Sequence, residues 1–245
     1  SQGIHLASGM DLFLGILSGI GWAAGQIVTF YCFSLIGSSK VMPITTAFQL
    51  LAASLWGVVA LGNWPGVSAK ILGAFSLILI IFGASLTVWS EEKTPASTGL
   101  LRKVVIFLAL GAIGYWAYSA APQASNLSGQ EAFLPQAIGM LLTALIYSIV
   151  ISFKEKSKMA IFESVSYKHI ISGFFFAFAA LTYLISAQPD MNGLATGFIL
   201  SQTSVVLATL TGIWFLNQRK TKKEMLLTII GLVLIIIAAS ITVTI

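Results

Sequence analysis

The sequence has very little charge. Only 9% of its 245 residues are Asp, Glu, Lys or Arg, whereas a soluble domain carries about 25%. Hydrophobic residues make up 57% of the chain and the mean hydropathy is +0.94. So few charged side chains cannot cover a water-facing surface. The composition therefore argues against a soluble enzyme, a nucleic-acid-binding protein and a disordered chain, and it indicates a polytopic membrane protein embedded in a lipid bilayer.

Residue types that serve catalysis and metal binding are also scarce. The single cysteine, Cys32, excludes an internal disulfide and a cysteine-based zinc site. The two histidines, His5 and His169, lie outside the centres of the apolar runs. No nucleophile stands in a pattern with a general base. We therefore expect neither enzymatic activity nor a metal site, and no cofactor.

What the sequence does contain is a series of long apolar runs. Crossing a bilayer takes roughly 20 residues of helix. The stretches that satisfy this length are 11–36, 41–62, 69–90, 103–121, 131–153, 167–187, 194–217 and 224–243. The runs are continuously apolar, so the sequence predicts an all-α polytopic membrane protein with eight transmembrane helices in this chain.

Basic residues alternate with these runs in a way that predicts the topology. One side of the predicted membrane collects Lys40, Lys93, Arg102, Lys103, Lys154, Lys156, Lys158, Lys168, Arg219, Lys220, Lys222 and Lys223. The other side has only Lys70. Because cytoplasmic loops carry the excess of Lys and Arg, the Lys/Arg-rich loops are predicted to be cytoplasmic and both ends of the chain to face outward.

The chain also resembles itself. Residues 81–88 match residues 236–243, which equates the first three predicted helices with the last three. Equivalent helices then cross the membrane in opposite directions, as in the inverted repeats of secondary transporters. This divides the chain into 1–92, the remainder of a first repeat with three helices, and 93–245, a second repeat with five. The difference predicts that two further helices belong before Ser1 in a ten-helix protein.

The membrane spans hold neutral polar groups rather than charges. Asp, Glu, Lys and Arg are absent from the centre of every predicted span, which argues against a cation channel or a proton pump. Amides and hydroxyls occur instead, and each needs a partner or a wet cavity within hydrocarbon. Amides beside aromatic rings suit a neutral polyhydroxyl ligand, since amides bond hydroxyls and rings cover its apolar face. The residues predicted to bind substrate are Gln26, Gln49, Gln202, Trp22, Tyr115 and Tyr118.

Two further groups of residues have alternative interpretations. Glu131, at the outer end of the fifth predicted span, is a weak candidate for proton coupling, and the alternative is an interfacial helix cap. Thr45, Thr46 and Ser201 lie within spans, where hydroxyls commonly join one helix to another. Their spacing alone does not separate substrate contact from helix packing.

Several segments resemble the bacterial glucose/ribose uptake transporter family of the drug/metabolite transporter superfamily. The resemblance is carried by residues 18–26, 37–50, 113–118, 134–140, 200–202 and 220–225. Among them are the segments Gly-Trp-Ala-Ala-Gly-Gln, Lys-Val-Met-Pro-Ile-Thr-Thr-Ala-Phe-Gln and Leu-Pro-Gln-Ala-Ile-Gly-Met. The resemblance implies a ten-helix fold of two inverted five-helix repeats, sugar uptake and proton coupling.

Together these features predict a secondary transporter of the bacterial plasma membrane that takes up a monosaccharide of the glucose or ribose type. It would work by alternating access between the two repeats, and the family resemblance implies coupling to protons. Two alternatives remain open at this point. One is export of a drug or metabolite by the same kind of protein, and the other is a membrane interaction subunit without transport. The identity of the sugar and the oligomeric state are left open as well.

Overall fold

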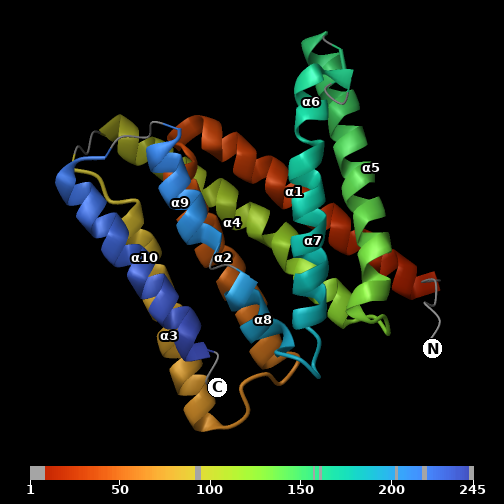
Figure 1. Cartoon of the computed structure of the whole chain (residues 1–245), viewed down its shortest axis with the longest axis horizontal. Coiled ribbons are helices and arrows are strands. Elements are labelled where there is room, and N and C mark those ends of the chain that lie inside the picture. Colours follow the sequence, from red (N-terminus) through yellow and green to blue (C-terminus); the bar gives the residue numbers. More distant parts are fainter. Residues whose placement is uncertain are drawn as a thin grey trace.

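In the computed structural model, all regular structure within the described residues is helical (Figure 1). The structure describes residues 9–91, 95–156, 158–159, 162–201, 204–216 and 220–242. The helices are α1 (Gly9–Ile36), α2 (Ser38–Val59), α3 (Val67–Thr87), α4 (Pro95–Gln123), α5 (Gly129–Glu155), α6 (Ser164–Lys168), α7 (Ile170–Ser186), α8 (Gly193–Ser201), α9 (Ser204–Trp214) and α10 (Lys222–Thr242). The predicted all-α fold class is confirmed.

The helices follow the predicted spans closely. Seven helical stretches in the described part of the chain are long and apolar enough to cross a membrane, with 193–214 (α8 and α9) forming one of them. The remaining predicted span corresponds to α7, which is apolar but has 17 residues. At 1.5 Å per residue it is about 25 Å long, so the number of membrane crossings stays a prediction.

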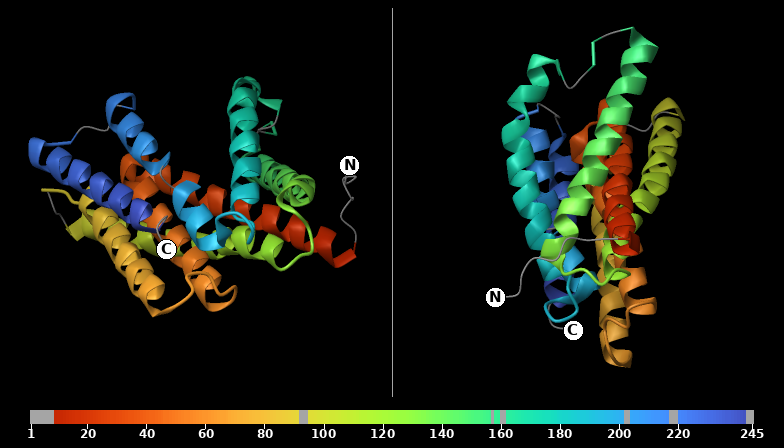
Figure 2. Two further views of the ribbon diagram at one scale, coloured as in Figure 1. Left: turned by 60° about the horizontal axis from the view of Figure 1, so that its bottom comes forward. Right: turned by 90° about the vertical axis from the view of Figure 1, so that its right-hand side faces the viewer.

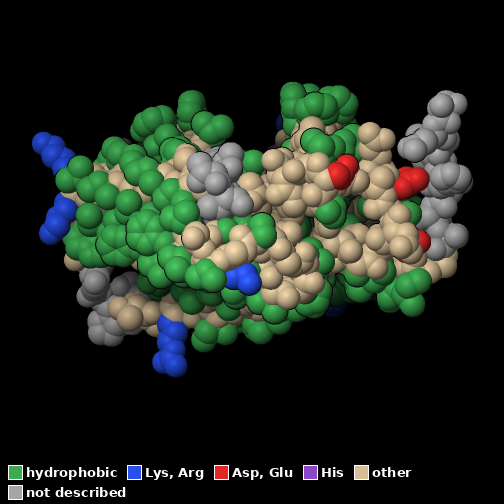
Figure 3. Space-filling view, turned by 90° about the horizontal axis from the view of Figure 1, so that it is seen from below, with side chains coloured by type: hydrophobic (Ala, Val, Ile, Leu, Met, Phe, Trp, Pro, Cys, Tyr) green, Lys and Arg blue, Asp and Glu red, His purple; other side chains and the backbone are tan. Residues whose placement is uncertain are grey.

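The outer surface of the helices is strongly apolar. Large hydrophobic side chains such as Phe13, Ile71 and Phe174 are exposed. Figure 3 shows hydrophobic side chains spread over much of the left half of the face seen from below, while the acidic side chains visible there lie at the right. In water such a surface would drive association, and in a bilayer it is the ordinary lipid-facing surface.

Two of the helices, α5 and α10, begin with a reciprocal capping pair. At the start of α5 the Ser128 hydroxyl accepts from the Glu131 backbone N–H, and the Glu131 carboxylate accepts from the Ser128 N–H at 2.9 Å. Thr221 and Glu224 form the same reciprocal pair at the start of α10. Each pair satisfies two backbone donors that the first helical turn leaves free. These caps fix where α5 and α10 enter the bundle.

Glycines let α1 approach α4 and α5 very closely. A Cβ at Gly19 would collide with the Gln136 backbone carbonyl on α5, and one at Gly139 with the Ile16 carbonyl on α1. At the α1–α4 crossing, a Cβ on Gly21 would lie 2.5 Å from the Gly114 carbonyl oxygen. Because larger residues would separate these helices, the glycines set the positions of the polar side chains that follow them on α1.

Helices α3 and α10 lie side by side and form a separate edge of the bundle (Figures 1 and 2). Gly83 and Gly231 face each other at their crossing, where a Cβ on Gly83 would lie 2.6 Å from the Gly231 carbonyl oxygen. These helices are matched members of the predicted repeat. Their contact is an observation, whereas the repeat itself stays a prediction.

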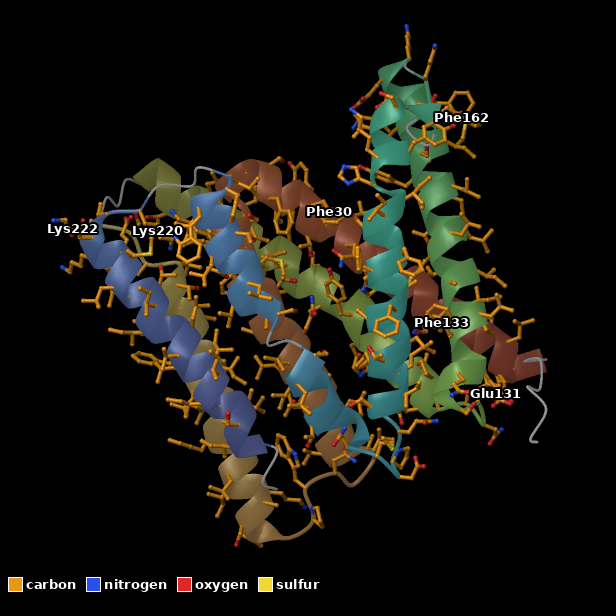
Figure 4. All side chains as sticks on the ribbon, viewed as in Figure 1. Phe30, Glu131, Phe133, Phe162, Lys220 and Lys222 are labelled. Carbon is orange, nitrogen blue, oxygen red and sulfur yellow. The ribbon has the colours of Figure 1, made fainter. Side chains whose placement is uncertain are left out.

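At one end of this pair, Lys220 ties the two helices together. Its ammonium group donates to the Thr87 carbonyl oxygen at the end of α3 and, at 2.8 Å, to Thr228 Oγ1 on α10. Burial, reinforced by the nearby Lys40 cation and opposed by Glu224, lowers the pKa of Lys220 to about 8. Figure 4 places Lys220 and Lys222 together near the start of α10.

This lowered pKa predicts a pH dependence of stability. An unfolded lysine titrates near pH ~10.4, so between pH 8 and about 10.4 the unfolded chain binds more protons than the folded one. The free energy of unfolding should therefore rise with pH across this interval. We expect the rise in thermal midpoint of the detergent-solubilised protein to be smaller in Lys220→Met. Lys222→Met, which changes an exposed lysine, is the control, and equal pH profiles for all three proteins would contradict the prediction.

Candidate functional site

A cavity of about 240 Å³ lies within the bundle, between α1, α2, α4, α7 and the α8–α9 segment. Its walls are lined by Trp22, Gln26, Thr29, Met42, Thr45, Thr46, Gln49, Tyr115, Tyr118, Phe176, Ala179, Ala180, Tyr183, Ser201 and Ser204. The walls carry hydroxyls, amides and aromatic rings but no Asp, Glu, Lys, Arg or His among the described lining residues. At ~30 Å³ per water, the volume corresponds to about eight water molecules, which is room for one small neutral molecule.

Most of the residues predicted to bind substrate meet at this cavity. Trp22 and Gln26 reach it from α1, Gln49 from α2, and Tyr115 and Tyr118 from α4. Gln202, the remaining predicted contact, lies outside the described residues. Its described neighbours in sequence, Ser201 and Ser204, both line the cavity. The structure thus assembles five predicted side chains from three helices, and their role in binding stays a proposal.

A chain of hydroxyls joins the three helices along one wall. Thr29 Oγ1 donates to the Gly25 carbonyl oxygen at 2.9 Å, so it accepts from the Tyr115 hydroxyl, also at 2.9 Å. Thr45 Oγ1 lies 3.5 Å from Thr29 Oγ1 and accepts from Gln49 Nε2 at 3.2 Å. These bonds hold Tyr115 and Gln49 in fixed orientations, which is the preorganisation that a selective polar site needs.

Amide groups on this wall keep free hydrogen-bonding capacity. Gln49 uses one N–H on Thr45, and its carbonyl oxygen has no partner among the described residues. Gln26 makes no hydrogen bond to any part of the chain that the structure describes. An amide in a membrane protein is costly without partners. The two glutamines therefore offer donors and acceptors to a ligand or to water in the cavity.

Aromatic rings form other parts of the cavity lining. Trp22 on α1 packs against Phe176 on α7, with ring centroids 4.2 Å apart. Tyr118 on α4 stacks with Tyr183 on α7 at 5.5 Å, and the Tyr183 hydroxyl donates to Ser119 Oγ at 3.0 Å. Rings of this kind cover the apolar C–H face of a bound molecule while the amides bond its hydroxyls.

Sequence reasoning passed over several lining residues, and one of them had a readable signal. Thr29 follows Gln26 by three residues and Trp22 by seven, so the three share one face of α1. Thr45 and Gln49 are four residues apart and likewise share one face of α2. Phe176 and Met42 carry no such signal, because only the packing of α7 and α2 brings them to the cavity.

Glu131 has a structural role away from this cavity. Its carboxylate accepts from the Ser128 backbone N–H and, at 2.8 Å, from the Ser128 hydroxyl. It is not one of the described cavity-lining residues, and Figure 4 shows it at the beginning of α5. The interfacial cap considered from the sequence is thus present, while the assignment to proton coupling remains a prediction.

No group of three or more His, Cys, Asp or Glu that could hold a metal occurs within the described ranges.

Helices α2 and α8 pack tightly against each other near the Asn63 loop. Ala53 and Ala195 are each at most 1% exposed. The Asn63 side-chain oxygen accepts from the Ala195 backbone N–H at 3.1 Å, and a Cβ on Gly57 would lie 2.8 Å from that same oxygen. Through this hydrogen bond, the loop that follows α2 is attached to the first turn of α8.

The fold and the cavity together define an all-helical polytopic membrane protein with a neutral, polar-aromatic site inside its helix bundle. A family model described as sugar transport protein matches residues 2–245. The chain belongs to this sugar transporter family.

Curated relatives agree with this assignment. The chain is 68% identical over 244 residues to a protein of Enterococcus faecalis named "Putative ribose uptake protein RbsU", covering 100% of the chain and 83% of the relative. Proteins with the same name from Lactiplantibacillus plantarum and Lactobacillus johnsonii are 67% and 66% identical, over 244 and 243 residues. The alignments cover 100% and 99% of the chain, and 83% and 82% of the relatives. The predicted family and the general class of sugar transporter are confirmed.

Proposed function

We propose that the protein takes up a monosaccharide, with ribose favoured, across the bacterial plasma membrane by alternating access. The observation that carries this proposal is the neutral cavity, where Gln26 and Gln49 keep free amide groups beside the rings of Trp22 and Tyr118. An anionic substrate would need Arg or Lys there, and a cationic one a carboxylate. A neutral polyhydroxyl molecule matches the side chains that are present.

The choice of ribose over glucose rests on the relatives, whose printed name specifies ribose uptake. The cavity volume of about 240 Å³ suits a single monosaccharide of either size. Glucose therefore remains the competing substrate. Export of a drug or metabolite is less well supported, because the walls carry uncharged hydroxyl and amide groups suited to a sugar.

Alternating access gives the α2–α8 contact a specific role. In the proposed topology the loop that holds Asn63 faces outward, so the α2–α8 contact that it stabilises lies toward the outer side of the membrane. Opening toward the outside then requires α2 of the first repeat (1–92) to separate from α8 of the second repeat (93–245). We further propose that the Lys/Arg-rich loops are cytoplasmic.

The test is uptake by the intact gene product in proteoliposomes, using labelled ribose and glucose with and without an inward proton gradient. We expect saturable uptake, with ribose transported at lower concentration than glucose. Accumulation above equilibrium under the gradient would establish a symporter, with Glu131 as the first residue to substitute. Equilibration alone would establish a facilitator. Absence of uptake of both sugars would overturn the proposal in favour of export or of an interaction subunit.

A further inference from the structure

A second, smaller cavity lies directly beside the first. Its volume is about 120 Å³, and it shares Phe176 and Ala180 with the larger cavity. It lies between α5 and α7, and Figure 4 shows Phe133 in the same region between these helices. Its lining residues are Phe133, Gln136, Ala137, Met140, Phe176, Ala177 and Ala180. Gln136 is the only polar side chain among these described lining residues.

The orientation of the Gln136 amide is fixed by its neighbours. Ser18 Oγ on α1 donates its one hydrogen to the Tyr118 carbonyl oxygen at 2.7 Å. Ser18 Oγ must therefore accept from Gln136, whose Nε2 lies 2.6 Å away. A flipped amide would place two acceptors against each other, so the nitrogen faces Ser18 and the oxygen faces away from it.

This arrangement leaves the Gln136 side-chain oxygen without a partner. Gln136 is 1% exposed, and no donor lies within hydrogen-bonding distance of Oε1 in the part of the chain that the structure describes. A buried acceptor in this condition costs about 1–3 kcal/mol. Helix packing explains the bond from Nε2 to Ser18, since it joins α5 to α1. It does not explain an acceptor left vacant on a side chain that lines the smaller cavity.

We propose that Gln136 Oε1 is a hydroxyl-accepting subsite of the sugar site, and that the second cavity takes the hydroxymethyl arm of the substrate. This inference rests on the proposed function. The cavity offers one acceptor within apolar walls, and a CH₂OH group has one hydroxyl donor on an apolar carbon. The sugar ring lies in the larger cavity, and for ribose this is the furanose ring, because only that form carries a hydroxymethyl arm. The arm passes Phe176 and Ala180 so that its hydroxyl donates to Gln136.

The test compares ribose with 5-deoxyribose, which keeps the arm carbon but lacks its hydroxyl, as competitors of labelled ribose uptake in proteoliposomes. A site built to bond a hydroxyl strongly rejects the analogue that lacks it. We expect 5-deoxyribose to compete at least tenfold more weakly than ribose against the wild-type protein. In Gln136→Met the two sugars should compete within about twofold of each other, because the acceptor is gone. Gln130→Met, the same substitution at an exposed position of α5 that lines neither cavity, should keep the wild-type ratio.

A second variant keeps the proposal testable if Gln136→Met does not reach the membrane. Ala177 lines the smaller cavity but not the larger one, so Ala177→Val fills the proposed arm site and should also abolish the preference for ribose over 5-deoxyribose. If the wild-type protein transports ribose but accepts 5-deoxyribose equally well, the proposed subsite is wrong while the proposed function stands. If the wild-type protein transports neither ribose nor glucose, the proposed function itself has failed.

Discussion

Gln49→Ala is expected to raise the sugar concentration needed for half-maximal uptake by about tenfold or more. Gln49 lines the larger cavity, and Thr45 fixes its amide through a bond of 3.2 Å. Its carbonyl oxygen is unpaired within the described chain and so is available to a sugar hydroxyl. Loss of one such bond, with the partner left unsatisfied, costs about 1–3 kcal/mol, and 1.4 kcal/mol corresponds to a factor of ten.

The measurement is concentration-dependent uptake in proteoliposomes, with the amount of protein in the membrane determined for each variant. Gln130→Ala is a matched control, because it removes the same side chain from an exposed position on α5. Uptake by this control should remain within about twofold of the wild-type value. If Gln49→Ala transports with wild-type kinetics, Gln49 does not contact the substrate.

Gly139→Ala is expected to destabilise the bundle and to impair transport at the same time. A methyl group at this position would collide with the Ile16 carbonyl oxygen and would lie 2.9 Å from the Ile20 backbone nitrogen. These are backbone atoms of α1, so relief requires α1 and α5 to move apart. Overpacking of this kind costs about 1–3 kcal/mol, which is a substantial part of the roughly 5–15 kcal/mol that stabilises a typical protein.

Transport should suffer because α1 carries Trp22 and Gln26, one to two turns beyond this crossing. Gly173→Ala on α7 is the control, since a Cβ there meets no atom within 4 Å. Thermal unfolding in detergent should show a midpoint several degrees lower for Gly139→Ala, and an unchanged or slightly higher one for Gly173→Ala. Equal midpoints for the two variants would show that the α1–α5 crossing is looser than the structure indicates.

Part of the site was predictable from the sequence because several of its side chains recur at helical spacing within a single helix. Trp22, Gln26 and Thr29 share one face of α1, and Thr45 and Gln49 share one face of α2, since residues four apart in a helix are neighbours. The scarcity of charged residues indicated a membrane protein, because a helix that spans a bilayer must be apolar over its whole length. The bounds of the helices followed from the same property and agree with the structure to within a few residues at most ends.

How the helices pack against one another could not be predicted in this way, because their packing depends on contacts between distant parts of the chain. Ser18 and Gln136 are 118 residues apart, and Thr29 and Tyr115 are 86 apart. Those bonds form only because glycines allow α1 to approach α4 and α5 backbone to backbone. A local sequence pattern does not show which residue of another helix lies across such a crossing.

The sequence by itself therefore determined the class of protein, the approximate position of its helices and five of the side chains that line the cavity. The tertiary structure alone decided that Phe176 and Tyr183 complete its walls, and that Gln136, which lines the adjacent smaller cavity, holds a vacant acceptor. The physical reason is that hydrophobicity and helical period act over a few neighbouring residues. The shape of a binding site depends instead on how closely whole helices pack.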